Sequence, residues 1–192
     1  PELSDEQREE ISTLFKSALP TDAEFSIQPE NLGEHAAPII ITQSEYMRRM
    51  KEASKYQAGM AFYAQMPDAF NLVLNSDHPL IKGVLDGEKQ ECGSQLSPVD
   101  SEIKGLEARL AVLHQSQSAK KPEEITQEEK DDVKNTEQSI QEQRTKRADI
   151  IAAYAKGNKV VHQLIDLALL QNGMLKGAAL DSFLKRSVDM IK

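Results

Sequence analysis

The side chains most able to bind a metal or act as a nucleophile are four histidines and one cysteine. They are His35, His78, His114, His162 and Cys92. A zinc site needs such ligands at short, regular spacings, and these residues are far apart in the sequence. The glycine-rich loops that bind phosphates and the G-x-S-x-G turn of a nucleophilic serine are also missing. The sequence therefore predicts no metal, no cofactor and no catalytic residue in this chain, and Cys92 is interpreted as an inert surface or loop residue.

Charged residues concentrate in the middle of the chain. Acidic pairs occur at 123–124, 128–129 and 131–132, and a basic cluster occupies 144–147. Acid–base catalysis requires carboxylates in a cleft that shifts their pKa values, and nucleic-acid binding requires concentrated Lys and Arg. Because the acidic pairs lie on a predicted solvated hairpin and acids flank the basic cluster, we interpret this region as the charged surface of helices.

The composition limits the class of partner. The 192 residues carry a net charge of −8, which disfavours nucleic acid and anionic membrane surfaces as partners. No apolar run reaches the roughly 20 residues of a membrane span, and residues 1–4 do not begin a signal peptide. A single cysteine cannot form an intramolecular disulfide. These features favour a cytoplasmic protein with a single domain.

Capping signals and hydrophobic periodicity predict the elements of the N-terminal half. A helix over 4–19 begins with Ser4, and Gln7 completes its capping box. Three short strands are predicted, at 25–27, 39–41 and 70–74. The second strand is a run of isoleucines, which indicates burial on both faces. A short helix from about His78 to Gly87 follows the third strand.

A methionine-rich segment lies between the second and third strands. Thr42 and Glu45 form a possible capping box for a helix over about 44–55. Its apolar positions are Tyr46, Met47 and Met50. Charged residues surround them, so we expect an exposed, adaptable surface for apolar partners. Packing onto the sheet is at least as favoured for the residues that follow, which include Met60, Phe62 and Met66.

Residues 97–147 predict an antiparallel helical hairpin. Ser97-Pro98 is a typical helix start, and Lys121-Pro122 predicts a turn. Thr126 with Glu129 restarts a helix. The first helix carries a short heptad seam formed by Val99, Ile103, Leu106, Leu110 and Leu113.

The C-terminal region is the most apolar part of the chain. It predicts a helix from about Asp149 to Gln171, closed by Asn172-Gly173, and a final amphipathic helix over 180–191. Residues 164–170 of the first helix are apolar nearly all round, with only Asp166 polar, so a second subunit is expected to cover them in a four-helix bundle. The predicted dimer-interface residues are Ile151, Tyr154, Val161, Leu164, Ile165, Ala168, Leu169, Leu180, Phe183, Leu184, Val188 and Ile191.

Several segments resemble the heat shock protein 90 chaperones in their bacterial form. Residues 70–81, with the N-x-D-H-P-L pattern, are similar to a strand and turn of that family. Residues 161–170, with Leu-x-Asp-x-Ala-Leu-Leu, are similar to its penultimate helix, and residues 183–187 to its final helix. Residues 37–50 resemble a strand of that family and the amphipathic helix that follows it. Their order and spacing agree as well, so the match is more specific than any one segment.

The sequence patterns predict an α+β fold in which a small three-stranded sheet packs with helices, beside a protruding helical hairpin that the resemblance does not cover. The resemblance implies that this chain is the C-terminal domain of such a chaperone. Residues 1–192 would form a single C-terminal dimerisation domain, with an inserted hairpin at about 97–147. The partners would be a second copy of the chain and unfolded client proteins, with Tyr46, Met47 and Met50 as the client-binding residues. The family acts in protein folding and the stress response, and its ATP and Mg are bound by an N-terminal domain outside this sequence.

Two features depart from the resemblance. Residues 92–148 are longer than the corresponding connection expected for bacterial members, and the chain ends without an acidic Met-Glu-Glu-Val-Asp tail. A coiled-coil adaptor that binds its partners through the 97–147 hairpin is therefore an alternative hypothesis.

Overall fold

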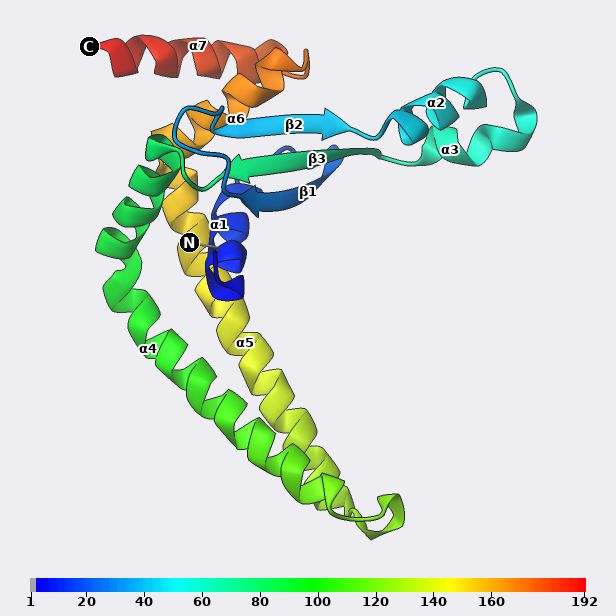
Figure 1. Cartoon of the computed structure of the whole chain (residues 1–192), viewed down its shortest axis with the longest axis vertical. Helices are drawn as coiled ribbons and strands as arrows, with labels where there is room; N and C mark the ends of the chain where they lie inside the picture. The colour runs from blue at the N-terminus through cyan, green and yellow to red at the C-terminus, as the bar shows by residue number, and fades with distance from the viewer. Residues whose placement is uncertain (1–2) are drawn as a thin grey trace. The chain divides into compact units, whose positions relative to one another are not determined.

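The computed structural model describes residues 3–192, and it divides into two compact units (Figure 1). One unit contains the chain up to Gly87 together with residues 155–192, and the other contains residues 88–154. The predicted absence of a signal peptide rests partly on Pro1 and Glu2, which lie outside the described residues. No helix in the described part of the chain is both long and apolar enough to cross a membrane.

The first helix forms as its sequence predicts. Helix α1 spans Asp5–Lys16, and the Ser4 hydroxyl accepts a hydrogen bond from the Gln7 backbone N–H. The Gln7 side chain accepts one from the Ser4 backbone in return, which completes the capping box. Ile11, Leu14 and Phe15 are buried on the face that packs against the sheet.

A mixed three-stranded sheet forms the centre of the first unit. Strands β1 (Ala23–Glu30), β2 (Ile39–Gln43) and β3 (Asp68–Asn75) lie in the order β1-β3-β2. β1 runs parallel to β3, and β2 runs antiparallel to it. Leu72 and Leu74 of β3 are fully buried, and α1 packs against β1 while a C-terminal helix packs against β2. The predicted α+β class with three short strands is confirmed.

The predicted burial of β2 on both faces is wrong. Ile39 and Ile41 are buried, but Ile40 between them is 37% exposed. β2 is an edge strand of the sheet, and its alternate side chains point to the uncovered face. A run of isoleucines therefore formed a strand with one buried face.

Residues 44–67 leave the sheet between β2 and β3 as a small helical segment. It contains α2 (Glu45–Ser54), the 3₁₀ turn η1 (Ala58–Met60) and α3 (Ala61–Gln65). The predicted cap at Thr42 is wrong, because Thr42 still belongs to β2 and pairs with Asn71. The N-cap of α2 is Ser44, whose hydroxyl accepts from the Met47 backbone N–H at 3.5 Å.

A buried asparagine closes the sheet. Asn75 ends β3 with no solvent exposure, and its side-chain oxygen accepts from the backbone N–H groups of Leu32 at 3.1 Å and Asp77 at 3.2 Å. Its side-chain N–H₂ donates to the carbonyls of Gly33 and Ala36, at 2.8 and 3.4 Å. This single amide therefore satisfies the backbone of the loop that joins β1 to β2.

The helices of the second unit are longer than the sequence predicts. Helix α4 runs without a break from Pro79 to Ser118, through Gly87 and Pro98. The predicted helix end at Gly87 and the predicted start at Ser97-Pro98 are therefore wrong. Pro98 lacks one helical hydrogen bond, but Leu96 and Val99 on either side of it are buried. Packing of these side chains outweighs the local signal for a break.

Within residues 88–154, α4 and α5 (Gln127–Gly157) form the predicted antiparallel hairpin. The turn contains a 3₁₀ segment at Pro122–Glu124, and the predicted capping box of Thr126 with Glu129 is confirmed by its two backbone hydrogen bonds. Ion pairs join the two helices: Arg144 to Glu107 and Arg147 to Asp100, both at 2.7 Å.

The interpretation of Cys92 as a surface or loop residue is wrong. The residue lies in α4 and is buried. Burial raises the pKa of its thiol, and the nearby carboxylates Glu88 and Glu91 raise it further. A raised thiol pKa lowers the thiolate fraction, so this environment disfavours reactivity.

The C-terminal region contains two helices after α5, with a break that the sequence prediction missed. The single helix predicted from Asp149 to Gln171 is two helices: α5 ends at Gly157, and α6 spans Lys159–Gln171. Asn158 is the N-cap, because its side-chain oxygen accepts from the Val161 backbone N–H at 3.0 Å. An asparagine after a glycine thus interrupts an otherwise continuous apolar pattern.

The predicted closure of α6 and the final helix are both present. Gly173 has φ 66°, the Met174 N–H donates to the Leu169 carbonyl at 2.9 Å, and the Gly173 N–H donates to the Leu170 carbonyl at 3.0 Å. This is a Schellman motif, in which glycine adopts the left-handed conformation without strain. Helix α7 then spans Gly177–Ile191 and packs antiparallel to α6.

Candidate interaction surfaces

Among residues 3–192, no three His, Cys, Asp or Glu side chains lie close enough together to hold a metal ion. Functional features are instead found on two exposed surfaces of the first unit. One is formed by α6 and α7, and the other by residues 44–67.

The predicted dimer-interface residues fall into two groups. Those already buried in the single chain are Ile151, Val161, Leu164, Ile165, Ala168, Leu169 and Phe183. Tyr154 and Leu180 are half-buried. The remaining three are exposed: Leu184 by 53%, Val188 by 57% and Ile191 by 85%. Only the exposed members offer a partner substantial apolar area.

Sequence reasoning missed two further exposed leucines, on α6. Leu167 is 41% exposed and Leu170 is 39% exposed. They follow Gln163 at spacings of i+4 and i+7, so they share the side of α6 that carries α7. We call Leu167, Leu170, Leu184, Val188 and Ile191 the C-terminal surface. The signal for the two leucines was the run from Leu164 to Leu170, in which only Asp166 is polar.

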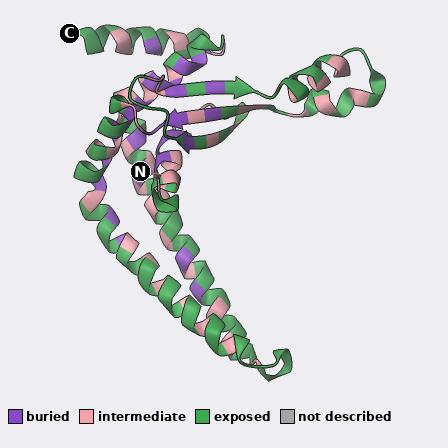
Figure 2. Ribbon diagram, in the orientation of Figure 1, coloured by how far each residue is buried: buried purple, intermediate pink, exposed green. Residues whose placement is uncertain are grey.

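The C-terminal surface continues along one stripe of α7. Leu180, Leu184, Val188 and Ile191 lie at i, i+4, i+8 and i+11. Phe183 is the only residue in α7 that is buried, and its backbone carbonyl accepts a hydrogen bond from Gln163 of α6 at 3.5 Å. Figure 2 shows α7 largely exposed along its length. A helix with a strong apolar stripe and one buried side chain has most of that stripe free to bind another molecule.

Residues 44–67 carry the second surface. No residue of α2, η1 or α3 is buried. Three aromatic side chains are highly exposed, Tyr46 by 61%, Tyr56 by 86% and Phe62 by 70%. We call these three residues the aromatic surface. The predicted packing of Phe62 onto the sheet is wrong, because α3 is held away from the sheet between β2 and β3 (Figure 1).

The candidate client-binding residues are only partly on this surface. Tyr46 is exposed, whereas Met47 and Met50 are half-buried. α2 and α3 pack against one another, and both methionines keep part of their surface accessible. Tyr56 belongs to an unusually apolar stretch of the sequence, but the spacing of that stretch alone could not predict its exposure.

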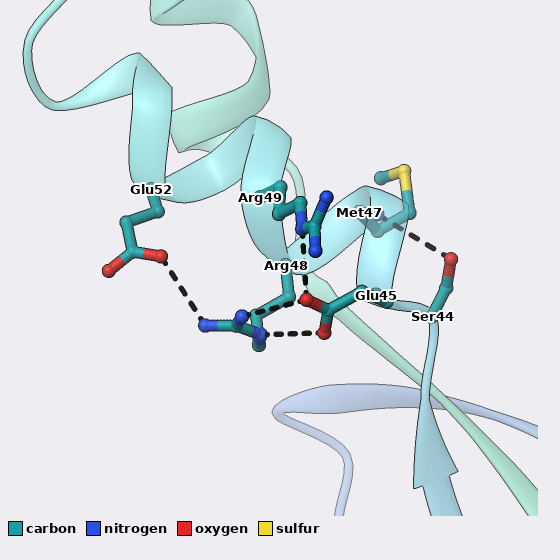
Figure 3. A network of polar contacts seen from close by, with 6 residues as sticks. All are labelled: Ser44, Glu45, Met47, Arg48, Arg49 and Glu52. Atoms are coloured by element: carbon teal, nitrogen blue, oxygen red, sulfur yellow. Dashed lines mark hydrogen bonds and ion pairs between the residues drawn. The ribbon is translucent and has the colours of Figure 1, made fainter.

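A network of charges occupies another face of α2 (Figure 3). The Glu45 carboxylate accepts from Arg48 at 2.9 and 3.0 Å and from Arg49 at 2.9 Å, and Arg48 also reaches Glu52 at 3.3 Å. The hydrogen bond from Arg48, followed by that from Arg49, lowers the pKa of Glu45 to about 2. These i,i+3 and i,i+4 pairs support a helix that has no buried residue of its own.

One ion pair anchors this segment to the sheet. Lys51 Nζ lies 2.7 Å from the Asp68 carboxylate at the beginning of β3. The Lys51 side chain is 22% exposed, so it is shielded more than the other charges of α2. Residues 44–67 are therefore attached to the sheet through β2, β3 and the Lys51–Asp68 ion pair, while the residues of the aromatic surface face solvent.

Comparison with known proteins places the chain in a family. It is 51% identical over 191 residues to the chaperone protein HtpG of Bacteroides thetaiotaomicron, in an alignment that covers 98% of this chain and 28% of that protein. It is 49% identical to the HtpG of Bacteroides fragilis, covering 96% of this chain and 28% of the relative. It is 43% identical to that of Porphyromonas gingivalis, covering 96% of this chain and 27% of the relative.

These matches confirm the resemblance to the heat shock protein 90 chaperones. Within that family, the chain belongs with the bacterial HtpG proteins as a segment that spans about 28% of the length of the curated relatives it matches. The length is consistent with the C-terminal segment that the resemblance implies. No protein-family model matches the chain, and no solved structure matches it.

The comparisons also correct the status of the helical hairpin. The expectation that residues 92–148 exceed the connection in bacterial members does not hold for these relatives. Alignments that cover 96% to 98% of the chain necessarily include most of the hairpin. The hairpin is therefore shared with these HtpG proteins.

Proposed function

We propose that this chain is the homodimerisation and client-contact segment of an ATP-dependent molecular chaperone of the cytoplasm. The curated relatives carry the name chaperone, which supports a role in protein folding and the stress response. ATP and Mg would be bound by a part of the full-length protein outside this chain. The partners of this chain would be a second copy of itself and unfolded client proteins.

The observation that carries the dimer proposal is the C-terminal surface. Leu184, Val188 and Ile191 are more than half exposed on one stripe of α7. Burying a Leu, Val or Ile side chain contributes about 1.5–3 kcal/mol, so leaving the stripe in water forgoes several such contributions. A second copy presents an identical stripe, and a two-fold axis would bring the two α6–α7 pairs together as a four-helix bundle.

Such a bundle would act as a tether. Two chaperone chains joined at this segment would have their other domains at a high effective concentration, so that distant parts meet without a further binding step. The function of the segment is then mechanical, and it requires no catalytic residue in the segment itself.

Subunit mixing tests this proposal. Ser182 is exposed on α7 outside the Leu180–Ile191 stripe, and Cys92 is buried, so Ser182→Cys accepts a single fluorescent label. Two populations carrying donor and acceptor dyes should develop energy transfer when mixed, and an excess of unlabelled chain should remove it. A mixture that never develops energy transfer would contradict the proposal.

The aromatic surface supports the client-contact part of the proposal. Unfolded proteins expose apolar side chains of many shapes, and large aromatic residues supply contact area at little entropic cost. Tyr46, Tyr56 and Phe62 lie on a segment that no buried residue fixes. The half-buried Met47 and Met50 beside them are flexible and polarizable, which suits contact with varied partners.

A further inference from the structure

A cluster of polar side chains joins α7 to α6. Gln163 Nε2 donates to the Ser187 hydroxyl at 2.5 Å and to the Phe183 carbonyl at 3.5 Å. Arg186 Nε donates to the Gln163 side-chain oxygen at 3.2 Å, and its guanidinium also forms an ion pair with Asp166. We call Gln163, Asp166, Arg186 and Ser187 the α6–α7 clamp.

The clamp is shielded from water. The Asp166 side chain is 18% exposed, and that of Arg186 is 22% exposed. Desolvation raises the pKa of Asp166 even though the charge of Arg186 acts in the opposite direction. Because the folded-state pKa is raised, the ionised carboxylate is disfavoured by the fold relative to the unfolded chain. The ion pair is therefore a poor source of stability at neutral pH.

Apolar contacts fix α7 only weakly. Phe183 is the single buried residue of α7, whereas Leu184, Val188 and Ile191 of the stripe are exposed. One buried ring permits rotation and sliding of a helix, because apolar contacts have no directional requirement. Hydrogen bonds between fixed donors and acceptors do have one. The clamp supplies several, from both helices, around a single turn of α7.

We infer that the α6–α7 clamp is a positioning device that sets the rotation and register of α7 on α6. It thereby presents Leu184, Val188 and Ile191 beside Leu167 and Leu170 in one continuous surface. The inference rests on the proposed dimerisation and adds to it the residues that determine how well two copies fit. Asp166 and Arg186 act through the orientation of α7, without needing to contact the second copy.

An apolar replacement of the ion pair tests the inference. In the variant Asp166→Leu with Arg186→Met, the two helices can still pack, but the ion pair and the hydrogen bond from Arg186 to Gln163 are lost, which leaves only the bonds of Gln163 to Ser187 and Phe183. We expect unchanged or higher thermal stability with a dimer that dissociates about tenfold more readily in sedimentation equilibrium. A structural role alone would lower both. The charge-exchanged variant, Asp166→Arg with Arg186→Asp, should recover most of the affinity.

The matched control is Lys185→Gln, which removes an exposed cation next to Arg186 and should change neither quantity. If the wild type is a dimer and the apolar variant dimerises equally well, the inference about the clamp is overturned, but the proposed dimerisation is not. Loss of helix content in the apolar variant would also overturn it, because the clamp would then be a stabilising contact. A wild-type chain that is monomeric throughout would refute the proposed dimerisation and this inference together.

Discussion

Phe183 and Leu184 are neighbours in α7 with opposite environments. Phe183 is 8% exposed and is the one buried residue of α7, whereas Leu184 is 53% exposed on the free stripe. The two residues therefore separate the contact that holds α7 in its own chain from the contact that we propose between chains. Mutations at the second position can test the interface without disturbing the first.

We predict that Leu184→Asp converts a dimer into a folded monomer. A carboxylate at the centre of an apolar interface would have to be desolvated without a partner, which costs several kcal/mol. In the single chain the same carboxylate faces water, so helix content should be retained, and thermal stability should fall only by the contribution of the lost dimer contact. Sedimentation velocity and circular dichroism measure the two properties separately.

The control for this variant is Ser182→Asp, which adds the same charge on another side of α7. It should leave the dimer intact. Leu164→Asp is a poor alternative because Leu164 is only 5% exposed, so this substitution would damage the fold directly. A Leu184→Asp variant that remains dimeric would place the interface elsewhere.

Asn75 is predicted to be the most important polar residue of the sheet. Asn75→Ala would leave the backbone groups of Leu32, Gly33 and Asp77 without their partner, at a cost of about 3 kcal/mol. Urea denaturation should show this loss as a lower transition midpoint. Asn71→Ala, at an exposed position of the same strand, should have little effect. Similar midpoints for the two variants would show that water replaces the lost bonds.

The charge network on α2 predicts an unusual titration. The hydrogen bonds from Arg48 and Arg49 lower the pKa of Glu45 to about 2. Because the folded-state pKa lies below the unfolded value, the support from this network is present above the ordinary carboxyl range and is lost as the pH falls through about 2. Carboxyl carbon NMR would follow this titration directly.

Arg48→Gln should raise the pKa of Glu45 toward the usual range for glutamate, near about 4.3. The same variant should reduce the helix content of residues 44–67, because an i,i+3 pair is lost. A Glu45 that titrates in the ordinary range in the wild type would show that solvent disrupts the network.

The aromatic surface is predicted to bind unfolded proteins. The double variant Tyr46→Ser with Phe62→Ser should weaken binding of reduced, carboxymethylated α-lactalbumin to this chain, since both side chains are exposed apolar contacts. Thermal stability should be unchanged because neither residue is buried. Gln57→Ser, an exposed polar position between them, is the control. Equal binding by all three proteins would remove client contact from the proposed function.

Local signals in the sequence predicted the parts of the fold that depend on nearby residues. The capping box at Ser4, the restart at Thr126 and the glycine closure after α6 all act within a few residues, and all are present. The errors arise where distant packing decides. Pro98 is the clearest case, since buried neighbours on both sides keep α4 continuous through a residue that normally begins or ends a helix.

The candidate surfaces could be predicted only in part for the same reason. Periodicity located the apolar stripe of α7, but it could not distinguish Phe183 from Leu184, because both are large and apolar. That distinction depends on the direction in which α6 approaches. The clamp was not predicted either, because Asp166 and Arg186 are 20 positions apart and neither belongs to a local motif.

The central claim is that the α6–α7 pair of one chain binds that of a second, and the mass of the wild-type chain in solution tests it most directly. Sedimentation equilibrium over a range of concentrations should give the wild-type chain twice the monomer mass of 21.4 kDa. The Leu184→Asp variant should have the monomer mass. A wild-type chain that retains the monomer mass at every concentration would contradict the account.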